Sequence, residues 1–461
     1  MVVASGRIGA LRWCSNGSST MALECWLHEV GASFEGVRIG FAGARQGLGV
    51  FAARPFERGD VVAALPRRLC IEAPLPPRSQ RHGCISDRVL ARAAGFCEDE
   101  GDGLLATDWG RSAVADVGAR VLFERGRGDK SPIAPYLNAL PALPPLHPLA
   151  EPWAVSLTSL SPSFAYLYHR FGRNCRACIE ALRAELGPAK MDEWLIPWAL
   201  GMVLTRNFAL SAWAAGQRTS TVAMVPLLDL FNHRTPGNRG EPTWTCSMDE
   251  RNNAVVMVAE RSIGLGDELT HAYTHASDAA MLCHYGIPPP ASRNSLGEVS
   301  FVVPPSVLHT APDAVETTDP AVLAARAACC ARHGWLDQGE PLLFSIPRDL
   351  HPRGALLALA RLLSFGSAAE IQEWEDRVFR VGSAVSVFPP AFRPTHERRA
   401  HVLIVSWLRR ALADALIALG TATPPGVHPR LANAVATVVS GEVGVLRDVL
   451  HTAEQQLGRM N

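Results

Sequence analysis

Residues 225–233 read VPLLDLFNH, and this apolar run with three polar side chains at its end is the segment that decides the fold. Burying Asp229, Asn232 and His233 beside apolar neighbours is costly unless each finds a hydrogen-bond partner. A second segment, GDELTHAY, follows at residues 266–273 and ends in Tyr273. The two segments together predict a narrow pocket that binds a polar ligand on one side and a nucleophile on the other.

The composition describes a globular chain with two to three domains. The chain has 461 residues, of which 48% are hydrophobic and 19% are charged, and this length exceeds that of one ordinary core. The formal net charge is zero, so no basic field indicates a nucleic-acid partner. No apolar stretch approaches the roughly 18 residues that a membrane span needs, so we expect no membrane association.

The eleven cysteines do not form a metal-binding pattern. Cys175 and Cys178 make one CxxC pair, and Cys329 and Cys330 are adjacent on a predicted helix. A structural zinc site needs a second paired motif at suitable spacing. We therefore expect reduced thiols in an intracellular protein and no metal.

The N-terminal region reads as a leader or disordered segment followed by a compact β unit. Residues 1–20 carry arginines and serines but no acid, which resembles an organellar leader. Apolar residues at helical spacing then predict a helix that begins near Met21 and stops at Gly31. Short strands are predicted at residues 37–39, 49–52 and 61–66.

The middle of the chain reads as helices interrupted by proline. Seven prolines fall between Pro132 and Pro152, and repeated proline predicts an extended path without regular helix there. Helical periodicity returns at residues 179–186 and 194–208. β-structure is predicted to resume at Ala223 and to include a hairpin of residues 243–248 and 254–258.

The C-terminal third reads as a helical domain with an interaction surface. Proline clusters at residues 288–290 and 304–305 separate it from the preceding strands. Ile404, Leu408, Leu412 and Leu416 recur at every fourth position until Gly420, which predicts a long amphipathic helix.

Six motifs in order resemble one family, the SET-domain protein methyltransferases. More narrowly, the chain resembles the Rubisco large-subunit lysine methyltransferase-like class from Met21 onward. The motifs are Gly47-Leu48-Gly49, Pro135-Tyr136-Leu137 with Leu140-Pro141, Thr205-Arg206, residues 229–233, Gly266-Asp267-Glu268 with Tyr273, and Tyr285-Gly286.

The resemblance implies an α+β architecture. A SET-domain β fold of small sheets with a pseudoknot would be split by a helical insert and followed by an all-α C-terminal domain. The implied segments are 1–20 as leader or disordered, 21–78 as the N-terminal part of the SET domain, 79–200 as the helical insert, 201–300 as the C-terminal part with the catalytic site, and 301–461 as a substrate-binding domain.

The resemblance also implies S-adenosylmethionine as the cofactor. Asp229 would either face the channel of the target side chain or hold local structure, and these readings stand side by side. A zinc-ligand role for His233 lacks companion ligands. The positions that match cofactor contacts in the family are Gln46, Gly47, Leu48, Arg206, Asn232, His233, Tyr285, Gly286 and Ile287.

The same resemblance assigns Tyr273 and Tyr285 as the catalytic pair. The family usually has Gly, Asn and Phe where this chain has Thr274, Asp278 and Ile287, and the first two changes place the rate in question. The expected substrate contacts are Phe208, Leu228, Asp229 and Trp244.

These assignments imply a protein-lysine N-methyltransferase. The apolar Phe208 and Leu228 suit the aliphatic stem of lysine, whereas an imidazole acceptor requires a hydrogen-bonding partner. The alternatives are a protein-histidine methyltransferase and a catalytically silent scaffold. We expect a monomer whose helical C-terminal domain contributes to binding a protein substrate. We expect it inside the cell, in the cytoplasm or nucleus first, with the chloroplast as the alternative.

Overall fold

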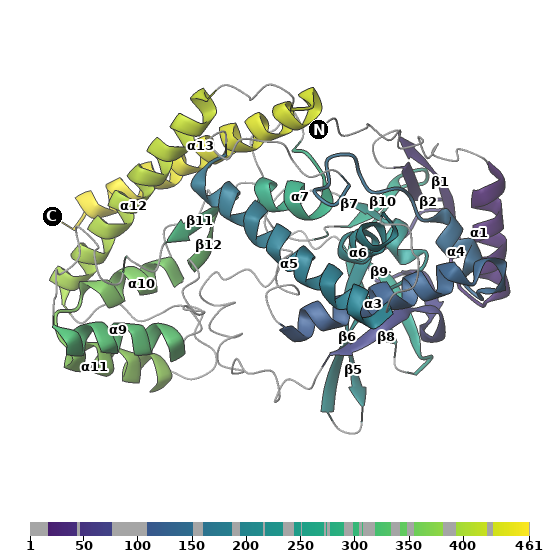
Figure 1. Cartoon of the computed structure of the whole chain (residues 1–461), viewed down its shortest axis with the longest axis horizontal. Coiled ribbons are helices and arrows are strands. Elements are labelled where there is room, and N and C mark those ends of the chain that lie inside the picture. The colour runs from purple at the N-terminus through teal and green to yellow at the C-terminus, as the bar shows by residue number, and fades with distance from the viewer. Residues whose placement is uncertain are drawn as a thin grey trace, which may run out of the picture. The chain divides into compact units, whose positions relative to one another are not determined.

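The computed structural model describes most of the chain and shows short strands alternating with helices (Figure 1). The described residues are 17–43, 47–75, 108–150, 160–186, 194–214, 217–233, 244–249, 251–271, 273, 277–289, 298–303, 307, 319–332, 342–347, 355–380, 393–421 and 427–460. Most of the predicted leader, and Gln46 and Thr274, lie outside these residues.

The contacts within the chain define two compact units. The first consists of Met1–Pro76, Asp108–Pro144 and Arg176–Tyr273. The second consists of Pro77–Thr107, Pro145–Cys175 and Thr274–Asn461. The domain boundaries inferred from the sequence stay predictions.

A four-stranded sheet in the first unit joins segments that are far apart in the sequence (Figure 1). Its order is β1-β2-β10-β7, in which β10 pairs antiparallel with β2 and parallel with β7. The polar end of residues 225–233 therefore lies beside the segment that leads to Tyr273. The predicted threading of a pseudoknot stays a prediction. The strands are β1 (Val37–Gly43), β2 (Gly47–Ala52), β7 (Asn232–His233) and β10 (Glu268–His271).

Two three-stranded sheets complete the described β-structure of the first unit. One has the order β3-β9-β8 and contains the predicted hairpin, which is confirmed. The other has the order β4-β6-β5. The strands are β3 (Val61–Pro66), β4 (Ile71–Leu75), β5 (Asn207–Ala214), β6 (Gln217–Met224), β8 (Trp244–Asp249) and β9 (Ala254–Ala259).

Helices of the first unit flank these sheets. The predicted N-terminal helix is confirmed as α1, and Gly31 after it has a φ of 84°. The helix α5 (Pro162–Leu186) supplies residues to both units. The other helices are α1 (Gly17–Glu29), α3 (Asp108–Gly126), α4 (Ala134–Ala139) and α6 (Leu195–Arg206), with short 3-10 turns η1 (Arg67–Leu69), η3 (Gly128–Lys130) and η5 (Leu228–Leu230).

The expectation of no helix in the proline-rich segment is wrong, because α4 forms inside it. Pro135 occupies one of the first two positions of α4. Backbone N–H groups in a first helical turn have no acceptor within the helix, so a proline there removes nothing that the helix uses.

The predicted helix of residues 194–208 ends too late, and β-structure resumes earlier than Ala223. α6 stops at Arg206, and the Asn207 side chain donates hydrogen bonds to the carbonyls of Val203 at 2.9 Å and Leu204 at 3.2 Å. These bonds satisfy acceptors that a helix end leaves open. Phe208 consequently belongs to strand β5, which pairs with β6 from Asn207 opposite Met224 onward.

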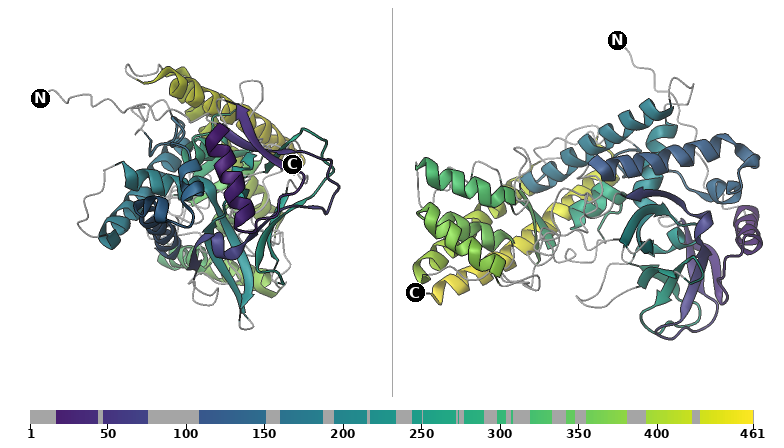
Figure 2. Two further views of the ribbon diagram at one scale, coloured as in Figure 1. Left: turned by 90° about the vertical axis from the view of Figure 1, so that its right-hand side faces the viewer. Right: turned by 90° about the horizontal axis from the view of Figure 1, so that it is seen from below.

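The second unit is predominantly helical, and α12 and α13 lie side by side in it (Figures 1 and 2). The predicted helix ending at Gly420 is confirmed as α12, and Cys329 and Cys330 lie on α9 as expected. The helices are α7 (Asp278–Tyr285), α9 (Pro320–Arg332), α10 (Ala355–Ser364), α11 (Ala368–Arg380), α12 (Pro394–Gly420) and α13 (Pro429–Gly458).

The C-terminal region is helical as predicted, but it is not all-α. Strands β11 (Glu298–Val303) and β12 (Leu342–Pro347) pair antiparallel along their whole length. Phe344 and Ile346 of β12 alternate into the core of the unit, where they pack with helical residues. The two strands are separated by a helix in the sequence, so no local turn signal indicates their pairing.

Among the described residues, no helix combines the length and the apolar character that crossing a bilayer requires.

Candidate functional site

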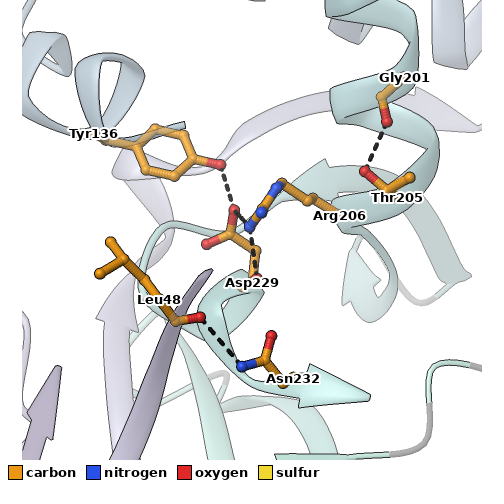
Figure 3. A network of polar contacts seen from close by, with 7 residues as sticks. All are labelled: Leu48, Tyr136, Gly201, Thr205, Arg206, Asp229 and Asn232. Carbon is orange, nitrogen blue, oxygen red and sulfur yellow. Dashed lines mark hydrogen bonds and ion pairs between the residues drawn. The ribbon is translucent and has the colours of Figure 1, made fainter. Parts of the chain in front are cut away.

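The side chain of Asn232, on β7, is hydrogen-bonded to the backbone of β2 in the same sheet (Figure 3). Its Nδ2 donates one hydrogen bond to the backbone carbonyl of Leu48 at 3.2 Å and one to Oε1 of Glu268 at 2.8 Å. Both donors of the amide therefore bind the protein, and its oxygen remains as the acceptor. We expected the Asn232 side chain to need a hydrogen-bond partner, and it has two, Leu48 and Glu268.

Gly49 lies where this network leaves no room for a side chain. A Cβ atom on Gly49 would come within 2.8 Å of three atoms, namely Cβ of Ala42, Nδ2 of Asn232 and Oε1 of Glu268. Cβ atoms in proteins do not come this close to other heavy atoms. Any residue other than glycine at position 49 would therefore displace Ala42, Asn232 or Glu268. Gly47, at the start of the same strand, has a φ of 74°, which also favours glycine.

Tyr273 packs into a cluster of rings from three strands of the first unit. Its backbone N–H donates to Nδ1 of His233 at 3.2 Å, and the two ring centroids are 5.2 Å apart. The ring of His271 lies 4.8 Å from that of Tyr273 and stacks on Phe208 at 5.8 Å with an interplanar angle of 17°. Phe208 and Tyr273, which we predicted as substrate and catalytic residues, thus both contact His271.

The hydroxyl of Tyr273 is held in its neutral form. Burial raises the pKa of Tyr273 to about 12, and the positive charge of Arg206 opposes the rise. At neutral pH the group is a phenol that donates or accepts a hydrogen bond and does not act as a base.

Arg206, Asp229 and Tyr136 form a buried polar network (Figure 3). The Nη1 atom of Arg206 donates to the backbone carbonyl of Asp229 at 2.9 Å and reaches Oδ2 of the same residue at 3.4 Å. The hydroxyl of Tyr136 donates to this Oδ2 at 2.8 Å. Of the two readings of Asp229, these contacts favour the one in which it holds local structure.

Burial dominates the electrostatics of this network. The carboxylate of Asp229 is fully buried, and burial raises its pKa, while Arg206 and the hydrogen bond from Tyr136 lower it. Burial also raises the pKa of Tyr136 well above its usual value. Nε of Arg206 and Oδ1 of Asp229 are buried and have no hydrogen-bond partner within the described part of the chain.

A strained turn precedes Asp229. Leu227 is fully buried and has a φ of 74°, a conformation that residues other than glycine rarely adopt. The turn is closed by a hydrogen bond from the N–H of Asp229 to the carbonyl of Val225 at 3.1 Å. Such strain persists only where surrounding contacts enforce it, and it is concentrated at functional sites. Leu228, an expected substrate contact, is fully buried in this turn.

Comparison with known families matches residues 47–274 to the SET domain. The chain contains a SET domain. Comparison with curated proteins found no match.

Solved structures show the same fold over nearly the whole chain. One is the crystal structure of the SET domain of LSMT bound to lysine and AdoHcy, which is 17% identical with a TM-score of 0.59 and covers 97% of this chain and 93% of its own. Another is the structure of Rubisco LSMT bound to AdoMet, also 17% identical, with a TM-score of 0.56 and coverages of 96% and 93%. The predicted SET fold, with small sheets, a helical insert and a helical C-terminal region, is confirmed.

Most predicted site residues lie in the first unit and contact one another there. Contacts link Leu48 to Asn232, His233 to Tyr273, and Arg206 to Asp229. Trp244 begins strand β8, and the position of its side chain is outside the described part.

Tyr285, Gly286 and Ile287 lie in the second unit, at the C-terminal end of α7. Gly286 has a φ of 66°, and a Cβ atom there would lie 2.8 Å from the backbone nitrogen of His147. A local requirement for glycine therefore exists at this position. Asp278 is in the first turn of α7 after the N-cap Ser277, where the helix dipole favours an acid.

Three contributors to the network were absent from the sequence-based set of site residues: Tyr136, Glu268 and His271. Tyr136 and Glu268 belong to motifs recognised in the sequence. The sequence therefore indicated their importance without assigning either residue a role in the site. His271 is the last residue of β10, two positions before Tyr273, and the centroids of the two rings are 4.8 Å apart.

The cysteines of the one CxxC pair lie on α5 and supply none of the site contacts described above. Cys175 and Cys178 are buried on α5, and burial raises the pKa of Cys178 to about 11. Within the described ranges, no group of three or more His, Cys, Asp or Glu side chains is placed to hold a metal ion.

Proposed function

We propose that this protein is an S-adenosylmethionine-dependent protein-lysine N-methyltransferase. The observation that carries the proposal is the junction of β2, β7 and β10, where Asn232 binds Leu48 and Glu268 while His233 binds the backbone of Tyr273. A match to the SET domain over the same residues supports it. The solved structures of the same fold that contain AdoMet, or lysine with AdoHcy, are consistent with it.

The residues of the junction fit a bound S-adenosylmethionine. Gly47 carries no side chain at the start of β2, so a ligand can approach the backbone there closely. Gly49 allows Asn232 and Glu268 to pack against the same strand. Gly47, Leu48, Asn232, His233 and Arg206 would hold the cofactor, whose sulfonium group supplies an electrophilic methyl. Gln46, Tyr285, Gly286 and Ile287 remain proposed contacts.

Tyr273 would align the acceptor amine. Methyl transfer is an in-line displacement, so the nitrogen lone pair has to point at the methyl carbon. A free lysine has a pKa of ~10.4, so its ammonium group must pass a proton to water before it reacts. Desolvation in the pocket favours the neutral amine because it lowers this pKa. The neutral hydroxyl of Tyr273 can accept a hydrogen bond from the amine and orient it. Tyr285 is proposed as the second aromatic residue of this pocket.

Lysine is favoured over histidine as the acceptor by the apolar character of Phe208 and Leu228. The ring of Phe208 stacks on His271, and its side chain supplies no hydrogen-bonding group. An aliphatic stem suits such a surface, whereas an imidazole acceptor requires a polar partner to orient it. We also propose that the helical C-terminal region contributes to binding the protein substrate.

Calorimetric titration with S-adenosylmethionine separates an enzyme from a silent scaffold. We expect saturable heat of binding to a single site on the full chain. A mixture of adenosine and methionine at the same concentration serves as the control and should give none. If S-adenosylmethionine also gives no heat, the protein does not bind the cofactor. It is then a catalytically silent scaffold, and the proposal is wrong.

A further inference from the structure

Tyr136 reaches Asp229 from the helical insert, which is far in the sequence from the segment that carries Asp229. It lies on α4, 1% of its surface is exposed, and its hydroxyl donates to Oδ2 of Asp229 at 2.8 Å (Figure 3). The two residues are 93 positions apart in the sequence. A hydroxyl bound to a carboxylate makes a charge-assisted hydrogen bond, which is stronger than a neutral one.

Asp229 depends on this bond because its carboxylate has few other partners. Its side chain is fully buried, and its contact with Nη1 of Arg206 is long, at 3.4 Å. The stronger bond of Arg206 goes to the backbone carbonyl of Asp229. A buried carboxylate remains charged only when hydrogen bonds and an opposite charge compensate for lost hydration. Among the described residues, Tyr136 donates the shortest hydrogen bond to the Asp229 carboxylate, at 2.8 Å against 3.4 Å for Arg206.

The orientation of Asp229 bears on the residues that follow it. Asp229 lies on η5, two residues after the strained Leu227 and three residues before Asn232. Arg206 is the last residue of α6 and is attached to this segment through Asp229. A shift of the carboxylate would therefore change the anchoring of Arg206 and of the turn that leads to Asn232 and His233.

We propose that Tyr136 is a positioning residue for methyl transfer, whose hydroxyl holds the Asp229 carboxylate in the orientation that anchors Arg206. The inference rests on the proposed function. Tyr136 acts through Asp229, so it is not a catalytic residue.

A pH profile distinguishes this role from general support of the fold. Among the described residues, the charged or titratable groups that act on Asp229 are Arg206 and Tyr136. Asp229 in turn acts on Tyr273, and Cys70 acts on Tyr136. Burial raises the pKa of Asp229, and the hydrogen bond from Tyr136 counteracts part of the rise. Removal of the hydroxyl therefore raises the pKa of Asp229 further. Activity that needs the carboxylate must then fail at a higher pH than in the wild type.

The test compares the pH dependence of kcat/KM for the wild type, Tyr136→Phe and Tyr168→Phe. Tyr168 lies on α5 and packs against a hydrophobic core of the second unit, so its variant loses the same hydroxyl in the other unit. For Tyr136→Phe we expect the acidic limb to move to higher pH by roughly one unit, with losses that shrink as the pH rises. Tyr168→Phe should keep the acidic limb of the wild type.

A double variant guards against a general defect in folding. Asp229→Asn removes the titrating carboxylate, so adding Tyr136→Phe to it should produce no further shift of the profile. An unshifted limb in Tyr136→Phe, with an active wild type, would overturn this inference alone. A uniform loss at every pH would also overturn it, because that pattern indicates a structural role. A wild type that transfers no methyl at any pH would instead overturn the proposed function.

Discussion

Asn232 and Gly49 show how single residues define the site. Both amide hydrogens of Asn232 bind Leu48 and Glu268, so a ligand would be contacted through its oxygen or its backbone. Gly49 makes this arrangement possible, because any side chain there would meet Asn232 and Glu268. The position and orientation of Asn232 therefore depend on the absence of an atom at residue 49.

The substitution Gly49→Ala tests this dependence. The added methyl group must displace Asn232, Glu268 or Ala42, each 2.8 Å from the position it would take. Overpacking of this kind costs about 1–3 kcal/mol, and we expect affinity for S-adenosylmethionine to fall by about 10-fold or more in calorimetry. Gly126→Ala is the control, because a Cβ atom there meets nothing within 4 Å. Equal affinity of Gly49→Ala and the wild type would show that the Asn232 network does not shape the cofactor site.

At the scale of elements, α13 buries an acidic residue in the second unit. Glu442 is 4% exposed and lies among apolar neighbours of that helix. Its pKa is raised to about 8, mainly by burial. The negative charge of Asp278 contributes to the rise, and a hydrogen bond with Ser161 opposes it. In the folded protein Glu442 is therefore largely protonated at neutral pH.

The pH dependence of stability follows from this protonation. Between the ordinary pKa of 4.5 and about 8, the folded state binds a proton at Glu442 that the unfolded state has released. The free energy of unfolding must therefore fall as pH rises through this window. Glu442→Gln should remove much of the decline, which amounts to roughly 1.4 kcal/mol for each unit of pKa difference. Denaturant unfolding at several pH values between about 5 and 9 measures it.

Glu454→Gln is the matched control on the same helix, because Glu454 is exposed and pairs with Arg409. Its curve should keep the decline seen for the wild type. If the curve of Glu442→Gln also runs parallel to that of the wild type, Glu442 does not account for the pH dependence.

Elements with local signals were predictable from the sequence, and elements made by distant pairing were not. The hairpin of β8 and β9 and the end of α12 at Gly420 follow from turn residues and periodicity, and both are confirmed. Strand β6 contains a run of serine and threonine that conceals its alternation, and β12 pairs with a strand on the far side of α9. Tertiary pairing decides such strands more than intrinsic propensity does.

The same distinction applies to the candidate site. The motifs indicated Asn232, His233 and Tyr273, since their order and residue types resemble one family. The bond between Tyr136 and Asp229 joins residues 93 positions apart, and a single sequence carries no signal for such a contact. The expectation that buried polar residues need partners predicted that bonds exist without identifying the partners.

At the scale of the whole molecule, the fold is retained while the sequence has diverged. The chain is 17% identical to the LSMT structure bound to lysine and AdoHcy, yet the shared fold extends over 97% of it. A likeness at this distance establishes the architecture, and the chemistry depends on the local geometry around Asn232 and Tyr273. The activity therefore has to be measured on this chain itself.

The most direct measurement is transfer of a tritiated methyl group from S-adenosylmethionine to a hypomethylated lysate, with the labelled residue located by peptide mass spectrometry. We predict that the wild type labels lysine. Tyr273→Phe should reduce labelling by about 100-fold, because it loses a group that orients the acceptor, while calorimetry shows that it still binds S-adenosylmethionine. Equal labelling by both proteins, or a methyl group found on an imidazole, would contradict the account.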